Sequence, residues 1–524
     1  MQNINLRVKC NGFFRLIPKS LIITLLTVSA QSYADDRAYD VINKAVAAYG
    51  GQKLLNLETL TLKSKGHSYS QWQSSDSLQG QMVSYLSENQ TEYAVDFVNQ
   101  QKVYKQATTR LVGSHGSNVP TVTHRIYKDN KGLNIDHALK QYKPSTRITF
   151  ENTGLGTERL LDTIVVKKLF MDKANSKWTD TAHIQGQVHD VLTVRSGEAN
   201  EYRVYINQQT GYLSRVLIKQ AGKINSYDFW AHINTDGIIW AKSLFVGNAN
   251  GPVQQSLFRQ VSFNVTMPTA FKIPFSYEQE TTKQYLNVSP LMFNQLAKGV
   301  YFVGQNWGYT LFIDRGDYYI SAGAWQMDSK TEAWKNALAL LREKTGVNKP
   351  IKQHIVTHHH NDHMMGLLDV LEQGANLIIH PAHIEAVQSY LPTPLSDERL
   401  VMFEQINDSA NDEVVLFDLP TSHANHNLAV YLPKQKILFT EDIFGSSFES
   451  AFHSPANWPD GDTYFRLEEL LHRTKELEIE FDLLVSSHHA RVLTKKEIET
   501  ALNIERPSAE TLIKRLFNES RKGK

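Results

Sequence analysis

The chain has 524 residues, 41% of them hydrophobic, and a formal net charge of +1 at pH 7. This length exceeds that of one ordinary domain, so two domains are expected, and the balanced charge argues against a nucleic acid as partner. A single cysteine, Cys10, leaves the chain without disulfides and without thiolate ligands for a metal.

The first 34 residues are typical of a secretory signal. Four lysine or arginine residues precede residue 20, residues 20–30 form an apolar stretch, and residues 32–34 form a small-x-small cleavage site. The apolar stretch is too short for a membrane anchor, so no stable membrane insertion is expected. We expect residues 1–34 to be removed as a signal peptide and the mature chain, beginning at Asp35, to be periplasmic or secreted. Cleavage changes the formal net charge from +1 to 1 − 4 = −3.

Residues 35–285 predict a curved, mostly antiparallel β-sheet domain that carries one or two helices. Helices are expected from Arg37 to Ala48, closed by Gly50-Gly51, and from Glu158 to Phe170. Short strand-like runs separated by polar turns occupy the rest, and they are Thr59 to Lys63, Met82 to Tyr85, Tyr202 to Ile206, Leu213 to Ile218 and Ile238 to Ala241, with residues 207–211 as a hairpin loop.

The opening of this segment, Ala48-Tyr49-Gly50-Gly51 followed by strands, is similar to periplasmic lipoprotein-carrier domains and to leaders that precede hydrolase domains in exported proteins. Residues 234–238 share the similarity. A generic sheet domain that packs on a catalytic domain explains the same pattern, and both interpretations stay open.

A second domain, residues 286–506, is expected after the closely spaced prolines between residues 268 and 290, which interrupt strand pairing. Strands and helices alternate in it as in a two-layered α/β fold. The expected elements are strands Val300 to Gly304, Tyr309 to Ile313, Tyr318 to Ile320 and Asn376 to Ile379, and a helix Lys330 to Lys344 with a capping box of Ser329 and Glu332. Residues 507–524 predict a basic C-terminal tail, a short helix with a solvated face.

The segment Thr357-His-His-His-Asn-Asp-His363 follows the β-branched pair Ile355-Val356 and predicts a metal site. In an extended segment, residues two apart point to the same side, so His358 and His360 can converge on one ion. Asp362 and His363 come directly before a helical pattern that runs from Met364 to Glu372. Their side chains are therefore expected to point in a different direction from those of His358 and His360. Two ions side by side are expected.

The remaining ligands are expected next to later strands. His423 precedes the strand Leu428 to Leu432, Asp442 follows Ile437 to Phe439, and His488 ends the apolar run Leu483 to Val485. Strand ends are where an α/β sheet presents its site. His426 is an alternative ligand to His423, and His489 is an alternative ligand to His488. We prefer His423 and His488, and we expect His426 to contact either a metal ligand or the substrate. The histidines left outside the site are His359, His380, His383 and His453.

These motifs resemble those of the metallo-β-lactamase superfamily. The resemblance implies an αβ/βα sandwich in the C-terminal domain, with two sheets face to face and metals at one edge. It also implies a ligand set, in which His358, His360 and His423 hold the first metal, Asp362, His363 and His488 hold the second, and Asp442 bridges both.

The chain departs from the family pattern at three places. Ser321-Ala322-Gly323 stands where many members have Asp-Thr-Gly, so a carboxylate that braces the ligand loops is missing and looser ligands are expected. Met364-Met365-Gly366 replaces a Gly-Gly pair, and Ser487-His488-His489 replaces Gly-His-Gly. Neither of these two changes removes a ligand.

Imidazole and carboxylate ligands favour Zn²⁺ and tolerate Fe or Mn, and two such ions can activate a shared hydroxide near neutral pH. The expected enzyme is an exported hydrolase of a small-molecule ester, lactone, thioester, phosphodiester or amide. Asp362 is its candidate catalytic residue, because it can orient the hydroxide and protonate the leaving group. The alternatives are a mononuclear iron sulfur dioxygenase-like enzyme and a lipid- or lipoprotein-binding protein with a structural metal domain.

Substrate contacts are expected from the loop after Gly323 and from the segment Phe444 to Asp462. Aromatic residues in or beside the second segment could form an apolar wall, although they are as readily packing residues, and they are Phe448, Phe452, Trp458 and Tyr464. The sequence does not identify the substrate or the oligomeric state.

Overall fold

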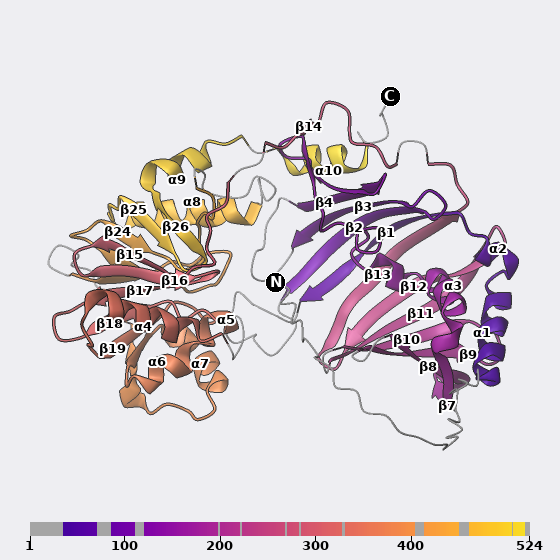
Figure 1. The fold of residues 1–524 in the computed structure, drawn as a ribbon, viewed down its shortest axis with the longest axis horizontal. Helices are drawn as coiled ribbons and strands as arrows, with labels where there is room; N and C mark the ends of the chain where they lie inside the picture. Colours follow the sequence, from indigo (N-terminus) through magenta and orange to yellow (C-terminus); the bar gives the residue numbers. More distant parts are fainter. Residues whose placement is uncertain are drawn as a thin grey trace, which may run out of the picture.

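The computed structural model describes residues 35–70, 85–110, 120–196, 200–220, 223–267, 270–281, 284–326, 331–403, 413–449, 461–505 and 507–518. The predicted signal peptide with Cys10 lies outside these ranges, as do Ser329, Phe452, His453 and Trp458. No helix among the described residues is both long enough and apolar enough to span a bilayer. The chain forms a large sheet followed by a smaller layered part (Figure 1).

The N-terminal part is built on one fourteen-stranded sheet, in the order β14-β6-β5-β4-β3-β2-β1-β13-β12-β11-β10-β9-β8-β7. Every strand pair is antiparallel except β14 with β6, as the mostly antiparallel prediction requires. The strands are β1 (Thr59–Ser70), β2 (Tyr85–Asp96), β3 (Gln101–Arg110), β4 (Thr121–Lys128), β5 (Lys131–Asp136), β6 (Gln141–Pro144), β7 (Ser176–Ile184), β8 (Gln187–Ser196), β9 (Asn200–Asn207), β10 (Leu213–Gln220), β11 (Lys223–Thr235), β12 (Ile238–Asn248), β13 (Gly251–Phe263) and β14 (Glu278–Gln279).

Three helices, α1 (Asp36–Ala48), α2 (Gln52–Leu55) and α3 (Asp162–Met171), pack on one part of this sheet. Short 3-10 turns flank α3, namely η2 (Thr157–Leu160) and η3 (Lys173–Asn175). The side chain of Asp35 caps α1 by accepting from Ala38 N at 3.0 Å, and its other oxygen accepts from Trp178 N in β7 at 2.7 Å. Asp35 therefore joins the start of α1 to β7.

The C-terminal part is an αβ/βα sandwich, which confirms the predicted fold class. Its seven-stranded sheet runs in the order β15-β16-β17-β18-β19-β20-β21, antiparallel as far as β18 and parallel after it, and its five-stranded sheet runs from β22 to β26 with only β24 and β25 parallel. The strands are β15 (Met292–Ala297), β16 (Val300–Gln305), β17 (Gly308–Asp314), β18 (Tyr319–Ala322), β19 (Ile351–Val356), β20 (Asn376–Ile379), β21 (Leu400–Met402), β22 (Val415–Asp418), β23 (Leu428–Leu432), β24 (Ile437–Phe439), β25 (Leu483–Ser486) and β26 (His489–Thr494).

One apolar core lies between the two sheets, where Phe302 and Leu311 of the first meet Val430, Phe439 and Val485 of the second. Two further cores lie on the outer faces under the helices. The helices on the seven-stranded side are α4 (Ala333–Thr345), α5 (Asn361–Met364), α6 (Leu367–Glu372) and α7 (Ile384–Tyr390), and those on the five-stranded side are α8 (Gly461–Glu476) and α9 (Lys495–Leu502).

Two helix predictions need correction. The helix expected from Lys330 begins only at Ala333, and its N-cap residue is Glu332, which has φ 40° and makes no side-chain capping bond. The other member of the predicted capping box, Ser329, lies outside the described residues. The continuous helix expected from Met364 to Glu372 is divided into α5 and α6 around Gly366. Gly366 N donates to Ala324 O at 3.0 Å, and a Cβ at this glycine would lie 2.4 Å from the same oxygen, so the close approach needs a glycine.

The predicted solvated C-terminal helix is instead packed on the N-terminal sheet. In α10 (Ala509–Phe517), Leu512, Leu516 and Phe517 are buried, and the last two contact Ala107 of β3. Arg515 donates to the backbone oxygens of residues 137 and 138 at 2.7 and 3.1 Å. Figure 1 shows α10 beside β3 and β4, away from α8 and α9. The end of the chain therefore packs back onto the N-terminal sheet.

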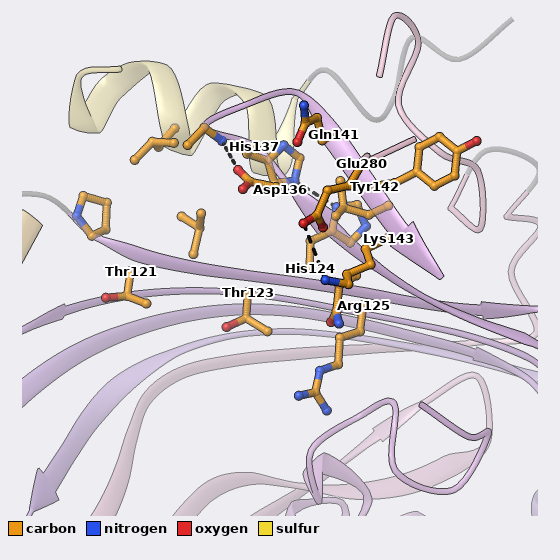
Figure 2. Close-up of a pocket in the computed structure, with 16 residues that line it drawn as sticks. Thr121, Thr123, His124, Arg125, Asp136, His137, Gln141, Tyr142, Lys143 and Glu280 are labelled. Atoms are coloured by element: carbon orange, nitrogen blue, oxygen red, sulfur yellow. Dashed lines mark hydrogen bonds and ion pairs between the residues drawn. The ribbon is translucent and has the colours of Figure 1, made fainter. Parts of the chain in front are cut away.

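A cavity of about 280 Å³ lies between β4, β5, β6 and α10 (Figure 2). In its lining, the rings of His124 and His137 stack with centroids 5.1 Å apart, and His137 also contacts the hydroxyl of Tyr277 at 2.8 Å. Burial, helped by Lys105 and Arg515, lowers the pKa of His137 to about 3. Both histidines are therefore neutral parts of the fold at physiological pH.

We expect the His137→Asn variant to lose stability less steeply with falling pH than the natural protein. A histidine whose pKa is depressed in the folded state contributes fully above its unfolded value near 6.5, and that contribution is lost as pH falls towards 3, at about 1.4 kcal/mol per pH unit. Hydrogen exchange of peptides from residues 120–144 at pH 6.5 to 4 measures this slope. The exposed His183 of β7 provides the control, because His183→Asn should leave the slope unchanged. Equal slopes for the natural protein and His137→Asn would refute the assignment.

Candidate metal centre

The backbone brings the predicted ligands to one edge of the sandwich. His358 and His360 follow β19, Asp362 and His363 lie in α5, and the other three predicted ligands follow or precede strands of the five-stranded sheet, at 423, 442 and 488. Backbone bonds join these segments: Leu428 N donates to Thr357 O at 2.7 Å, and Ser487 N donates to Glu441 O at 2.7 Å. The site therefore lies where loops from both sheets are bonded to one another.

The first group consists of His358, His360, His423 and Asp442, each of which offers one ligand atom within 4.8 Å of the others. Nε2 of His423 lies 3.2 Å from Nε2 of His358 and 2.8 Å from Oδ2 of Asp442. The ring of His360 is 4.4 Å from that of His423. The three histidines are 1 to 2% exposed, so this group forms the closed side of the centre.

The second group consists of Asp362, His363 and His488. Nε2 of His488 lies 3.1 Å from Nε2 of His363 and 3.9 Å from Oδ2 of Asp362. The side chains of Asp362 and His488 are 18% and 17% exposed, whereas His363 is buried. Solvent and small molecules therefore reach the centre from the second group.

Asp442 lies between the two groups. Its Oδ2 is 2.8 Å from His423, 3.5 Å from His363 and 3.6 Å from His488, and its Oδ1 is 3.8 Å from Nε2 of His358. One carboxylate thus faces imidazoles of both groups, which is the position that the resemblance implies for a bridging ligand.

The donor atoms fit divalent cations with nitrogen and oxygen ligands. In a tetrahedral zinc site with metal–nitrogen distances of about 2.0–2.1 Å, two ligand nitrogens lie roughly 3.3 Å apart. The His358–His423 and His363–His488 nitrogens are 3.2 and 3.1 Å apart, close to that tetrahedral edge. Each group can therefore accept an ion with little rearrangement.

The charges of the centre favour a bound cation. Burial lowers the pKa of His358 well below its ordinary value. Burial opposes ionisation of Asp442, but His423, His358 and His363 bring its pKa well below the usual range. Burial would also lower the pKa of His363, yet the carboxylates of Glu441, Asp362 and Asp442 raise it well above 6.5. A proton on His363 is thus held by the same negative field that would hold a metal ion.

Glu441 is a functional candidate that the sequence analysis missed. Its side chain is 2% exposed, Oε1 lies 2.5 Å from Nδ1 of His363, and Oε2 lies 3.8 Å from Nδ1 of His358. An Nδ1–H that donates to this carboxylate leaves Nε2 of His363 with its lone pair towards the centre. The sequence signal was limited to a second acid beside Asp442, and the backbone at Glu441 is left-handed, with φ 54°.

The carboxylate expected to be missing at Ser321 is matched by another carboxylate, that of Glu441, beside His363. Ser321 contacts Nδ1 of His354, 2.8 Å away, and does not reach a predicted ligand by any hydrogen bond recorded among the described residues. Glu441 supplies a bracing carboxylate from the other sheet. The expectation of looser ligand placement stays a prediction.

The competing histidines point elsewhere. His489 packs against Gly445, where a Cβ would lie 2.1 Å from the His489 ring, and His488 is the member of this pair that joins the second group. His426 contacts Asp418 at 2.8 Å and joins a separate group with His380. The ring of His359 stacks on that of His383 at 5.3 Å.

The predicted aromatic wall is not formed by Phe448, which is 2% exposed and packs on Tyr285 with ring centroids 4.5 Å apart. The side chain of Tyr464 lies outside the described part. Two tryptophans lie beside His488 instead: Trp307, which the sequence analysis missed, and Trp325, which lies in the expected substrate loop after Gly323. The Trp325 ring is 5.8 Å and the Trp307 ring 6.4 Å from the His488 ring, and Trp307 is 55% exposed. Trp307 sits in the turn between β16 and β17, which gives no sequence signal for function.

An αβ/βα sandwich with histidines and aspartates gathered at one edge defines a class of metal-dependent hydrolases. Residues 328–488 match the family model described as the metallo-beta-lactamase superfamily. The C-terminal part of the chain therefore contains a domain of that superfamily. No curated protein sequence is significantly similar to the chain.

Several solved structures are similar to the C-terminal part. A metallo-β-lactamase from Pseudomonas aeruginosa in a mono-zinc form is 21% identical, covering 43% of this chain and 97% of its own, with a TM-score of 0.32. One from Hirschia baltica is 19% identical, covering 42% and 100%, with a TM-score of 0.31. One from Erythrobacter litoralis with β-mercaptoethanol in the active site is 20% identical, covering 43% and 99%, with a TM-score of 0.31. These values carry no information on the substrate of this chain.

Proposed function

We propose that the protein is a zinc-dependent hydrolase that holds two ions and cleaves an ester, lactone, thioester, phosphodiester or cyclic amide bond of a small molecule. The supporting observation is that the Asp442 carboxylate faces imidazoles of both ligand groups. Three histidine and carboxylate donors on each side of one shared carboxylate are more than a single ion needs. This favours the two-ion hydrolase over a mononuclear iron sulfur dioxygenase-like enzyme.

The proposed roles follow from position. His358, His360 and His423 hold one ion, and His363, His488 and Asp362 hold the other. When bound, such ions lower the pKa of water and polarise a carbonyl or phosphoryl oxygen. The side chain of Asp362 is 18% exposed at the open side, and it can hold and pass a proton to the leaving group.

The tryptophans beside His488 provide a binding surface at the open side. Trp307 offers its exposed ring next to the more accessible ligands, and the ring of Trp325 also meets the His488 ring edge-on. A flat aromatic surface favours a substrate with an apolar or ring-shaped portion next to the bond that is cleaved.

A substrate panel tests the proposal. The zinc-loaded chain beginning at Asp35 is assayed with lactones, thioesters, phosphodiesters, sulfate esters and β-lactams, and with the His358→Ala variant. We expect turnover of at least one class and its loss in His358→Ala, because that substitution removes a buried donor of the first group. His472→Ala is the matched control, since His472 is exposed on α8 and only pairs with Glu476. One iron and no zinc after aerobic purification, or turnover unaffected by His358→Ala, would overturn the assignment.

We also propose that the protein is exported and cleaved before Asp35. The support is the signal-like sequence of residues 1–34 together with the bonds of Asp35 to α1 and β7. Expression of the full chain followed by cell fractionation and N-terminal sequencing should give a periplasmic or extracellular protein that begins at Asp35. An uncleaved cytoplasmic product would contradict export.

A further inference from the structure

A third group of metal-binding side chains lies outside the two described above. It consists of His380, which follows β20, Asp418 at the end of β22, and His426 in the loop before β23. Each offers a donor atom within 4.8 Å of the others. None of the three belongs to the proposed two-ion centre, and the sequence analysis set His380 aside.

The geometry of this group suits one cation. Oδ2 of Asp418 lies 2.8 Å from Nδ1 of His426 and 4.0 Å from Nε2 of His380. The two imidazole rings stack with centroids 4.0 Å apart and planes inclined by 17°. These donor separations lie on either side of the roughly 3.3 Å edge of a tetrahedral zinc site, so small side-chain shifts bring all three atoms to one ion.

The backbone around the group is fixed by bonds that do not use the donor atoms facing the ion. Asn427 N donates to Oδ1 of Asp418 at 3.1 Å, which orients the carboxylate. The His383 ring contacts the backbone oxygen of His426 at 3.0 Å. Arg473 reaches the backbone oxygen of Asp418 at 3.2 Å, and the ion pairs recorded for the Asp418 carboxylate among the described residues are with the two histidines alone. No lysine or arginine thus neutralises this carboxylate in the described part of the chain.

We propose that His380, Asp418 and His426 form a third divalent-metal site, which binds Zn²⁺ or a similar transition metal and leaves coordination positions for water. Two imidazoles and one carboxylate match the donors that these ions prefer. The side chains are 17%, 16% and 38% exposed, so an ion reaches them from solvent. The site is weaker than the two-ion centre, because it has three protein ligands and more water around it.

Binding has a local consequence at His380. Ala382 N donates to Nδ1 of His380 at 3.2 Å, so the neutral ring carries its proton on Nε2. Ligation through Nε2 moves that proton to Nδ1 and breaks this contact at the start of the 3-10 turn η4 (Pro381–His383). Metal binding therefore changes the η4 backbone, and nitrogen NMR of the His380 ring reports the change of tautomer.

The site also touches the loop of the main centre. His423 and His426 lie three residues apart in the loop between β22 and β23, and they face the first group and the third group respectively. An ion bound to His426 restrains the same loop that presents His423. We expect the third ion to leave first during dialysis and His423 to become more mobile when it does.

Zinc titration of the full mature protein tests the site, with bound metal counted by calorimetry and elemental analysis. We expect one more zinc equivalent in the natural protein than in the double variant His380→Gln and His426→Gln. His472→Gln controls for adventitious binding at an exposed histidine and should keep the natural stoichiometry. The test compares the bound zinc of the natural protein with that of the double variant. The difference between them does not depend on how many ions the main centre holds.

The proposal is overturned if the natural protein and the double variant bind equal amounts of zinc, or if His472→Gln loses as much as the double variant does. If the double variant does not fold by circular dichroism, His426→Gln alone is judged by the same difference, because this histidine is the most exposed of the three. An unchanged His380 nitrogen spectrum in saturating zinc also refutes the proposal.

Discussion

Replacing Asp442 by asparagine is expected to lower kcat/KM at least about 1,000-fold, which corresponds to roughly 4 kcal/mol of transition-state stabilisation. Asparagine keeps the shape of the side chain but removes the negative charge that faces His358, His423, His363 and His488. Both proposed ions lose the same ligand. Bound zinc should fall together with activity, and steady-state kinetics with elemental analysis measures both losses.

The control for this variant is Asp482→Asn. Asp482 is exposed and immediately precedes β25, the strand whose other end leads to His488. This substitution makes the same chemical change far along the strand from the centre, so activity and zinc content should be unchanged. A natural zinc content in Asp442→Asn would show that the carboxylate does not bridge the two groups.

The fold class could be predicted because its signals are local. The strand and helix periods around residues 300–380 and the ligand motif after β19 gave the layered C-terminal part correctly. The errors lie where distant segments decide the outcome. The break at Gly366 results from contact with Ala324, and the position of α10 depends on an apolar face that meets β3, some four hundred residues earlier in the chain. A helical pattern predicts that α10 has an apolar face, but it does not predict which part of the protein packs against that face.

The candidate site shows the same division. The ligands in the segment 358–363 lie close in sequence, and their grouping follows from strand and helix geometry. The residues that the sequence analysis missed act across the fold. Trp307 reaches His488 from a turn of the other sheet, and Asp418 joins His380 and His426 from three separate segments. No single stretch of sequence carries these contacts, so they could not be predicted from one chain alone.

Substituting Glu441 is expected to weaken metal binding in the second group without removing a ligand. Glu441→Gln keeps an oxygen that can accept from Nδ1 of His363 but loses the charge, so we expect about 10-fold weaker binding of the more accessible ion. Glu441→Ala leaves His363 without this acceptor, and about 100-fold weaker binding is expected. Competition with a chromophoric chelator measures both affinities.

If Glu441 positions His363, metal affinity should decrease from the natural protein to Glu441→Gln and decrease further in Glu441→Ala. A purely structural role does not predict this order. Because Glu441 is buried and its backbone oxygen accepts from Ser487 N, either variant could also loosen the loop that carries His488. The backbone bond survives both substitutions, so the difference between glutamine and alanine isolates the side-chain contact with His363. Equal affinities in the two variants would mean that the charge and the hydrogen bond at Nδ1 do not orient the ligand, and that the ring is held by packing instead.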